Sequence, residues 1–127
     1  MTRILLIGAG GFAGSILRYA LSGLVQDAAR DSLFPYGTLA VNVLGCLGIG
    51  VLMELAEARG AFGVETRALL VTGLLGGFTT FSAFGNETLY LLRDAERVLA
   101  TANVLANVIL GLAAVQLGRV AAQLVWR

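Results

Sequence analysis

Residues 73–87 read GLLGGFTTFSAFGNE, and this stretch decides which fold the chain can adopt. Gly76 and Gly77 are adjacent, and the hydroxyl residues Thr79, Thr80 and Ser82 follow them closely. Glycine costs about 1 kcal/mol relative to alanine inside a helix, and hydroxyl side chains compete for backbone hydrogen bonds. The run therefore predicts a helix that is interrupted at this point.

The predicted interruption lies in a chain that is apolar along most of its length. Hydrophobic residues make up 57% of the 127 residues and charged residues 13%, against roughly 25% charged in a soluble domain. Four apolar segments cover residues 4–25, 36–55, 68–92 and 98–117. Each approaches the roughly 20 residues that cross a 30 Å hydrocarbon layer as a helix. The sequence predicts an all-α membrane protein with one domain over residues 1–127 and four transmembrane helices, the third broken near mid-membrane.

The residue types that the chain lacks exclude several classes of function. There is no histidine, so Ser-His-Asp and Cys-His catalytic groups and imidazole metal sites are excluded. The nine basic residues are nearly balanced by eight acidic ones, and no basic run is available for a nucleic-acid backbone. Cys46 is the single cysteine and lies in an apolar run, which favours a small buried hydrophobic residue. We expect neither an enzyme nor a nucleic-acid-binding protein.

The N-terminal stretch ILLIGAGGFAG has the spacing of a dinucleotide-binding motif at Gly8, Gly10 and Ala13. An α/β enzyme needs several strands and a water-facing surface, and the rest of the chain offers neither. A cleaved signal peptide is a second alternative, but the apolar part continues to Arg18 without a convincing cleavage site. We therefore expect an uncleaved first span.

Small residues are needed where helices meet inside a membrane, because lipid supplies no hydrophobic force between spans. The first span contains one G-x-x-x-G pair, Gly10 and Gly14, and the third contains another, Gly73 and Gly77. These pairs predict close contacts between helix backbones.

Four spans place both termini and the loop between spans two and three on one side of the membrane. That side holds Arg3, Arg59, Arg67, Arg119 and Arg127. The opposite side holds Arg30, Arg93 and Arg97, with Arg18 near the same end of the first span. This near balance leaves almost no positive-inside bias. It is compatible with oppositely inserted copies in an antiparallel homodimer, and equally with one orientation set by one or two arginines.

Two spans carry amide side chains at helical spacing. Thr38 and Asn42 share a face of the second span, while Asn103, Asn107 and Gly111 form a stripe on the fourth. Amides inside a membrane either bind a neighbouring helix or line a watery path, and both interpretations stay open here.

Two phenylalanines follow the predicted break. Phe81 and Phe84 project from one side of a helix, with Thr88 a turn further along. The edge of a phenyl ring carries partial positive charge. Such edges, beside hydroxyl and amide donors, can surround a small anion, although core packing also explains them.

These stretches together resemble one family. GGFAGSILRY (10–19), YGTLAVNVLGCLGIG (36–50) and GLLGGFTTFSAFGNET (73–88) are similar, in this order and over nearly the whole chain, to the bacterial fluoride channels, the Fluc or CrcB family. The resemblance implies a four-span subunit that forms a dual-topology antiparallel homodimer with two fluoride pores. It also implies a structural sodium ion at the dimer centre, bound by main-chain carbonyl oxygens at the break.

The matching positions imply roles for individual residues. Phe81 and Phe84 would line the pores, and Asn42 would be the pore amide. The carbonyl oxygens of Gly76 and Thr79 would bind sodium. The remaining implied pore positions are Thr80 and Ser82 in the same motif, Arg18 near the vestibule, Thr38 and Glu87 beside the pore, and Asn103 and Asn107 along the fourth span. The family has a tyrosine and hydroxyl residues in that span where this chain has amides, so the route there is not implied in detail.

The implied function is passive fluoride efflux through a multi-pass protein of the bacterial inner membrane, which protects the cytoplasm from fluoride. Two other classes stay open. A small proton-coupled multidrug exporter also has four spans, but it needs a carboxylate in the first one, and residues 4–25 contain none. A non-transporting assembly subunit explains the packing glycines but needs no interrupted third span.

Overall fold

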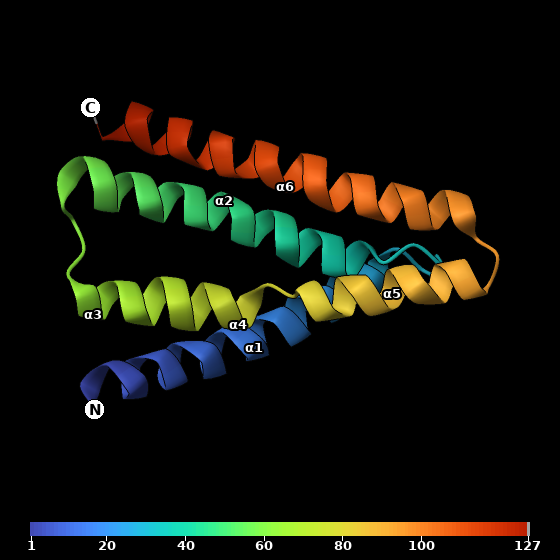
Figure 1. Ribbon diagram of the computed structural model, residues 1–127, viewed down its shortest axis with the longest axis horizontal. Helices are drawn as coiled ribbons and strands as arrows, with labels where there is room; N and C mark the ends of the chain where they lie inside the picture. The colour runs from blue at the N-terminus through green and yellow to red at the C-terminus, as the bar shows by residue number, and fades with distance from the viewer. Residues whose placement is uncertain (127) are drawn as a thin grey trace.

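The computed structural model of the chain describes residues 1–126, and helices make up most of this part (Figure 1). The helices are connected in an order that runs back and forth along one axis. Their bounds are α1 (Thr2–Ala28), α2 (Tyr36–Arg59), α3 (Val64–Arg67), the π-helix η1 (Ala68–Leu75), α4 (Gly76–Phe78), α5 (Phe81–Arg93) and α6 (Arg97–Val125). No strand occurs among the described residues.

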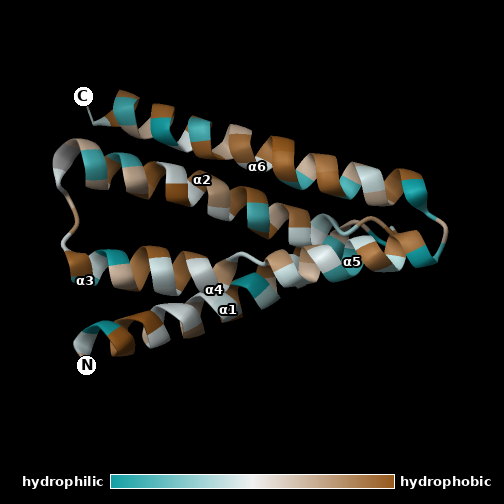
Figure 2. Cartoon of the chain, viewed as in Figure 1, coloured by the Kyte–Doolittle hydropathy of each residue, from teal (hydrophilic) through white to brown (hydrophobic). Residues whose placement is uncertain are grey.

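Four helical runs are long and apolar enough to cross a membrane. They cover Thr2–Ala28, Tyr36–Ala58, Val64–Arg93 and Arg97–Val125, and each contains one of the four predicted segments. Figure 2 shows hydrophobic residues distributed along each of these runs. The prediction of an all-α chain with four candidate membrane spans is confirmed.

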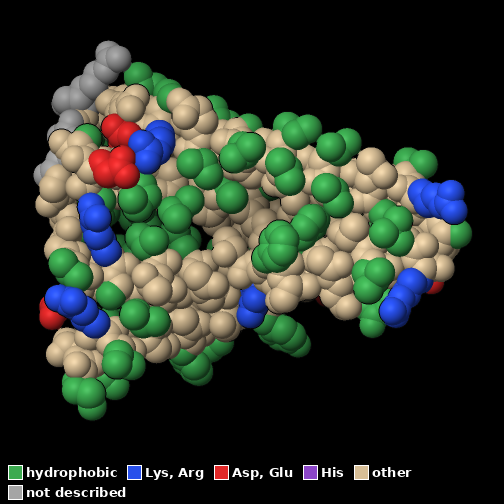
Figure 3. All heavy atoms as spheres, in the orientation of Figure 1, with side chains coloured by type: hydrophobic (Ala, Val, Ile, Leu, Met, Phe, Trp, Pro, Cys, Tyr) green, Lys and Arg blue, Asp and Glu red, His purple; other side chains and the backbone are tan. Residues whose placement is uncertain are grey.

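The fourth run extends past the predicted end at residue 117 because its polar residues find partners on α2. Arg119 contacts the carboxylates of Glu54 at 3.7 Å and Glu57 at 3.1 Å, and the Gln123 amide donates to Glu54 at 3.0 Å. Most charged side chains in view in Figure 3 lie toward the two ends of the molecule. Polar residues at a helix end can therefore continue the helix instead of terminating it.

The helices form two closely packed pairs. The first pair is α2 with α6, which lie side by side along most of their length in Figure 1. The second pair is α1 with η1 and α4. The segment α5 contacts α6 and α2, whereas within residues 1–126 no Cα atom of α1 lies within 8 Å of a Cα atom of α5. Its position against α2 and α6 therefore depends on few neighbours.

Glycines allow the backbones of α1 and the third run to touch. A methyl group on Gly10 or Gly14 would collide with backbone atoms of Leu69 or Leu74. A methyl group on Gly77 would lie 2.6 Å from the Gly11 carbonyl oxygen. The contacts predicted from both G-x-x-x-G pairs are confirmed, and they lie between the first and third runs.

The backbone between α4 and α5 is not helical. Thr79 has φ −87° and ψ 160°, and Thr80 has φ −149° and ψ 118°, so both are extended. The two glycines before them remain in a helical run, with Gly76 at φ −62° and ψ −37°. The residues that leave the helix are therefore the threonines, while Gly77 stays helical where it packs against Gly11. The π-helix η1 that precedes this segment has no counterpart in the sequence prediction.

Candidate functional site

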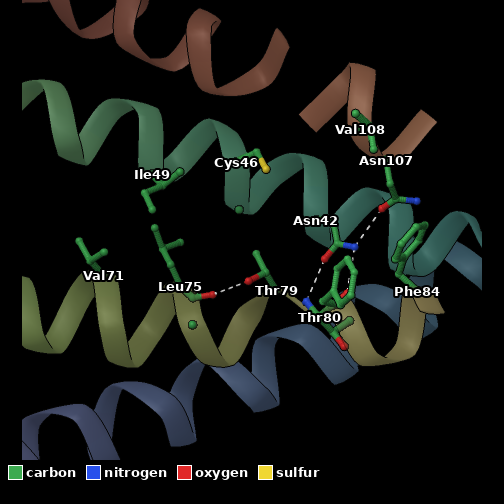
Figure 4. Close-up of a pocket in the computed structure, with 13 residues that line it drawn as sticks. Asn42, Cys46, Ile49, Val71, Leu75, Thr79, Thr80, Phe84, Asn107 and Val108 are labelled. Carbon is green, nitrogen blue, oxygen red and sulfur yellow. Dashed lines mark hydrogen bonds between the residues drawn. The ribbon is translucent and has the colours of Figure 1, made fainter. Parts of the chain in front are cut away.

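Asn42 on α2 holds the extended backbone of Thr80 by two hydrogen bonds. Its Oδ1 accepts from the Thr80 N–H at 2.9 Å, and its Nδ2 donates to the Thr80 carbonyl oxygen at 3.1 Å (Figure 4). Thr80 is 8% exposed, so an unpaired N–H and carbonyl there would cost on the order of 1–3 kcal/mol each. The amide of Asn42 replaces the helical bonds that the extended backbone gives up.

The side chain of Thr80 starts the next helix. Its Oγ1 accepts from the N–H of Ala83 at 3.1 Å, which is an N-cap on α5, and it lies 3.3 Å from the Ser82 hydroxyl. Thr79 turns the other way, because its N–H and its hydroxyl both reach the Leu75 carbonyl at 3.0 Å. The two threonines thus complete the helix ends on either side of the extended segment.

An amide ladder, formed by Asn42, Asn107 and Asn103, connects α2 to α6. Asn42 Nδ2 also donates to Asn107 Oδ1 at 2.9 Å, and Asn107 Nδ2 donates to the Oδ1 and main-chain oxygen of Asn103, both at 3.0 Å. Asn103 Nδ2 then donates to Thr88 Oγ1 on α5 at 2.9 Å. Asn103 is 0% exposed, so all its polar contacts are internal. The stripe predicted on the fourth span thus connects helices.

Thr38 and Glu87 form a second contact between α2 and α5. The Thr38 hydroxyl donates to Glu87 Oε1 at 2.6 Å, and Thr38 is 4% exposed. Glu87 Oε2 is buried and has no hydrogen-bond partner within residues 1–126. One turn of α2 therefore carries both residues that anchor the interrupted helix, Thr38 and Asn42.

The two phenylalanines lie on the first turn of α5. Their ring centroids are 5.4 Å apart with an interplanar angle of 50°. Phe81 is 84% exposed and Phe84 is partly buried. The other residues of the described part of the chain therefore leave most of the Phe81 ring uncovered.

A cavity of about 400 Å³ lies beside these residues, between α2, α6 and the third run (Figure 4). Its polar lining comes from Asn42, Thr79, Thr80 and Asn107 at one end. Its apolar lining comes from Cys46, Ile49, Val71, Leu75, Phe81, Phe84 and Val108. Cys46 is only partly buried and lines this space, whereas the sequence favoured a small buried hydrophobic residue. The cavity combines amide and hydroxyl groups with aromatic rings.

The carbonyl oxygens of Gly76 and Thr79 are free to accept a ligand. The N–H of Thr80, which would bond to Gly76 in a continuous helix, is taken by Asn42. Within residues 1–126, no hydrogen bond to either carbonyl oxygen is formed. Gly76 is exposed, and both residues line the cavity. Carbonyl oxygens at an unwound helix end are suitable ligands for a hard cation such as sodium.

The structure brings most of the predicted site residues together, but not Arg18. Arg18 lies on α1, whose Cα atoms are all more than 8 Å from those of α5 within residues 1–126, and it makes no ion pair with another described residue. Thr88 is a part of the site that the resemblance did not assign. The sequence feature that pointed to Thr88 was its position one helical turn after Phe84.

The fold and the site define a class: a helical membrane protein whose third span unwinds beside a cavity lined by amides, hydroxyls and phenyl rings. Residues 5–119 match the model of the family described as CrcB-like protein, Camphor Resistance (CrcB). The chain belongs to this family, and the resemblance inferred from its motifs is confirmed.

Curated relatives cover nearly the whole chain. The chain is 48% identical over 122 residues to the fluoride-specific ion channel FluC 1 of Methanosarcina acetivorans, which covers 96% of this chain and 92% of the relative. It is 47% identical to the fluoride-specific ion channel FluC of Methylobacillus flagellatus, over 93% of this chain and 92% of the relative. A FluC protein of Parabacteroides distasonis is 48% identical over 93% of this chain and 91% of its own length. These relatives are channels, and the four apolar runs agree with a multi-pass membrane protein.

Replacing Asn42 by alanine leaves the N–H and carbonyl of Thr80 without partners. We expect Asn42→Ala to lower the free energy of unfolding by about 2–6 kcal/mol, about 1–3 kcal/mol for each of the two groups, measured by titrating the detergent-solubilised protein with dodecyl sulfate. Gln116→Ala is the matched control, because this exposed amide on α6 makes no hydrogen bond within residues 1–126. Equal unfolding curves for the two variants would contradict the role of Asn42.

Proposed function

We propose that the chain is a fluoride-selective channel that gives passive fluoride efflux across the bacterial inner membrane. The relatives that match nearly the whole chain are named fluoride-specific ion channels. The observation that carries the proposal is the cluster of neutral donors and ring edges around the extended Thr80 backbone. We place this extended segment near the middle of the membrane, because roughly equal lengths of the third run lie on its two sides.

Selectivity follows from the chemistry of the cavity lining. Fluoride is small and holds its water tightly, so a selective pore must replace that water with close donors. The amides of Asn42 and Asn107 and the hydroxyls of Thr80 and Ser82 are neutral, and so they attract the ion without trapping it. The ring edges of Phe81 and Phe84 carry partial positive charge. A pore whose donors converge on an ion of the size of fluoride refuses a larger halide by size.

The functional unit in this proposal is an antiparallel homodimer of oppositely inserted copies. Phe81 is 84% exposed in one chain although it belongs to the proposed pore. A second copy would cover this ring and would close the open side of the cavity. The nearly equal numbers of arginines on the two sides support insertion in both orientations.

A structural sodium ion at the dimer centre fits the free carbonyl oxygens of Gly76 and Thr79. Two copies would supply four such oxygens, which are the kind of ligand that sodium prefers at unwound helix ends. A bound cation supplies positive charge close to the pore. The guanidinium of Arg18 adds to that field at the vestibule, which favours anions over cations.

The acid–base equilibrium of hydrogen fluoride explains why a cell benefits from such a channel. Hydrogen fluoride is neutral and crosses membranes, then ionises in a near-neutral cytoplasm. The trapped anion accumulates unless a path for it exists. A passive fluoride pore uses the membrane potential, negative inside, to drive the anion out.

Liposomes loaded with potassium fluoride test the proposal. Purified protein should release fluoride when a potassium ionophore is added, and liposomes loaded with potassium chloride should retain their chloride. Phe81→Ala and Phe84→Ala should each lower the fluoride rate at least about tenfold, because each removes a ring edge from the pore.

Phe12→Ala is the matched control, since Phe12 lies on α1 with 72% of its surface exposed and outside the cavity. Its rate should equal that of the wild type. Absence of fluoride release from wild-type liposomes would remove the channel proposal. Normal release by both pore variants would overturn only the assignment of the phenylalanines.

Sodium removal tests the cation site separately. We expect the dimer in detergent to dissociate more readily when sodium is replaced by N-methylglucamine, as measured by size-exclusion chromatography. Thr79→Ala should keep the sodium effect, because the proposed ligand is a main-chain oxygen and not the hydroxyl. A dimer with the same stability at every sodium concentration would count against the site.

A further inference from the structure

A series of hydrogen bonds, called here the hydrogen-bond chain, runs in one direction from the residue before the first turn of α5 back to that turn. Each group donates to the next, so the chain has a defined first donor and a defined last acceptor. From donor to acceptor it passes through Thr80, Asn42, Asn107, Asn103, Thr88 and Phe84. The last bond runs from the Thr88 hydroxyl to the Phe84 carbonyl oxygen at 2.8 Å. The chain therefore begins immediately before the turn that carries Phe81 and ends at Phe84.

The two ends of this chain fix its direction. The first group is the backbone N–H of Thr80, which can only donate, and the last is the carbonyl of Phe84, which can only accept. Each amide between them has one orientation that satisfies both neighbours. A flip of Asn107 would set its NH₂ group against the NH₂ group of Asn42 and its oxygen against the oxygen of Asn103.

Asn103 is central to this hydrogen-bond chain but lies behind the cavity lining, where it is bonded to Asn107. It is 0% exposed and does not line the cavity, whereas Asn42 and Asn107 do. Its amide connects Asn107 on α6 to Thr88 on α5. An ion in the cavity cannot contact a side chain that is covered on all sides. The chemistry of Asn103 thus differs from that of a residue on the ion path.

We propose that Asn103 and Thr88 are positioning residues of the channel, which hold the first turn of α5, and with it Phe81 and Phe84, in a fixed place against α2 and α6. This inference rests on the proposed channel function. No Cα atom of α1 lies within 8 Å of one in α5 among residues 1–126, so the hydrogen bonds of α5 to α2 and α6 contribute to its placement. The Thr38–Glu87 bond is a separate link, which keeps α5 attached when the ladder is cut.

Thr88→Val removes the last two bonds of the hydrogen-bond chain without changing the shape of the side chain. We expect fluoride efflux from liposomes to fall about tenfold, because the buried Asn103 amide loses its acceptor and the Phe84 carbonyl loses the Thr88 donor. Thr88→Ser keeps the hydroxyl and should restore the rate. Thr101→Val is the matched control, because this exposed threonine on α6 donates only to the Arg97 carbonyl of its own helix. A wild-type rate for Thr88→Val would overturn the proposal.

A double-mutant cycle tests whether the two residues act through one ladder. Asn103→Leu removes the link on both sides of Asn103, so adding Thr88→Val should cause no further loss of flux. Losses that multiply would show two independent effects and would overturn the proposal. Size-exclusion profiles are compared for all variants, so that a misfolded protein is not counted as a slow channel.

A measurement that needs no flux keeps this inference separate from the channel function. A 4-fluorophenylalanine placed at residue 84 reports the surroundings of the ring by fluorine NMR of the whole protein in detergent. We expect one narrow resonance in the otherwise wild-type protein and a broadened or split one with Thr88→Val. Thr101→Val should leave the spectrum unchanged. Identical spectra for all three proteins would overturn the positioning role, whether or not the wild type conducts fluoride.

Discussion

The two hydrogen bonds between Asn42 and the backbone of Thr80 are the interaction on which the rest of the site depends. An extended segment inside an apolar helical bundle has polar backbone groups that lipid cannot satisfy. Asn42 satisfies the N–H and the carbonyl of Thr80, and it thereby leaves the Gly76 carbonyl without its helical donor. One amide thus stabilises the unwound segment and frees an oxygen beside the cavity.

The same residue connects the unwound segment to the fourth span. Asn42 uses its remaining N–H for Asn107, so both of its donors are committed in the absence of an ion. A fluoride ion that binds to this amide must replace one of these acceptors. The Thr80 bond belongs to a two-point contact, and the Asn107 bond is a single one, so the second is easier to exchange. The amide acts as a support for the backbone and, in the proposed channel, as a donor to the ion.

The sequence alone was sufficient for the coarse fold and for the glycine contacts, because both depend on hydrophobic length and residue size. It did not predict which residues leave the third helix. Local propensity points to the glycines, but Gly77 stays helical where it packs against Gly11, and the two bonds of Asn42 stabilise extended backbone at Thr80 instead. Spacing placed Asn103 and Asn107 on one face without naming their partners, which lie on α2 and α5. A helix periodicity contains no information about the neighbouring helix.

The central claim is that this cavity selects fluoride over other anions. The most direct test is the reversal potential measured across a planar lipid bilayer that contains the purified protein. With a tenfold fluoride gradient and equal chloride on both sides, we predict a reversal potential close to the fluoride equilibrium value of about 59 mV. A tenfold chloride gradient at equal fluoride should leave the potential at zero. A potential near zero in the first condition, or one that follows chloride in the second, would contradict the account.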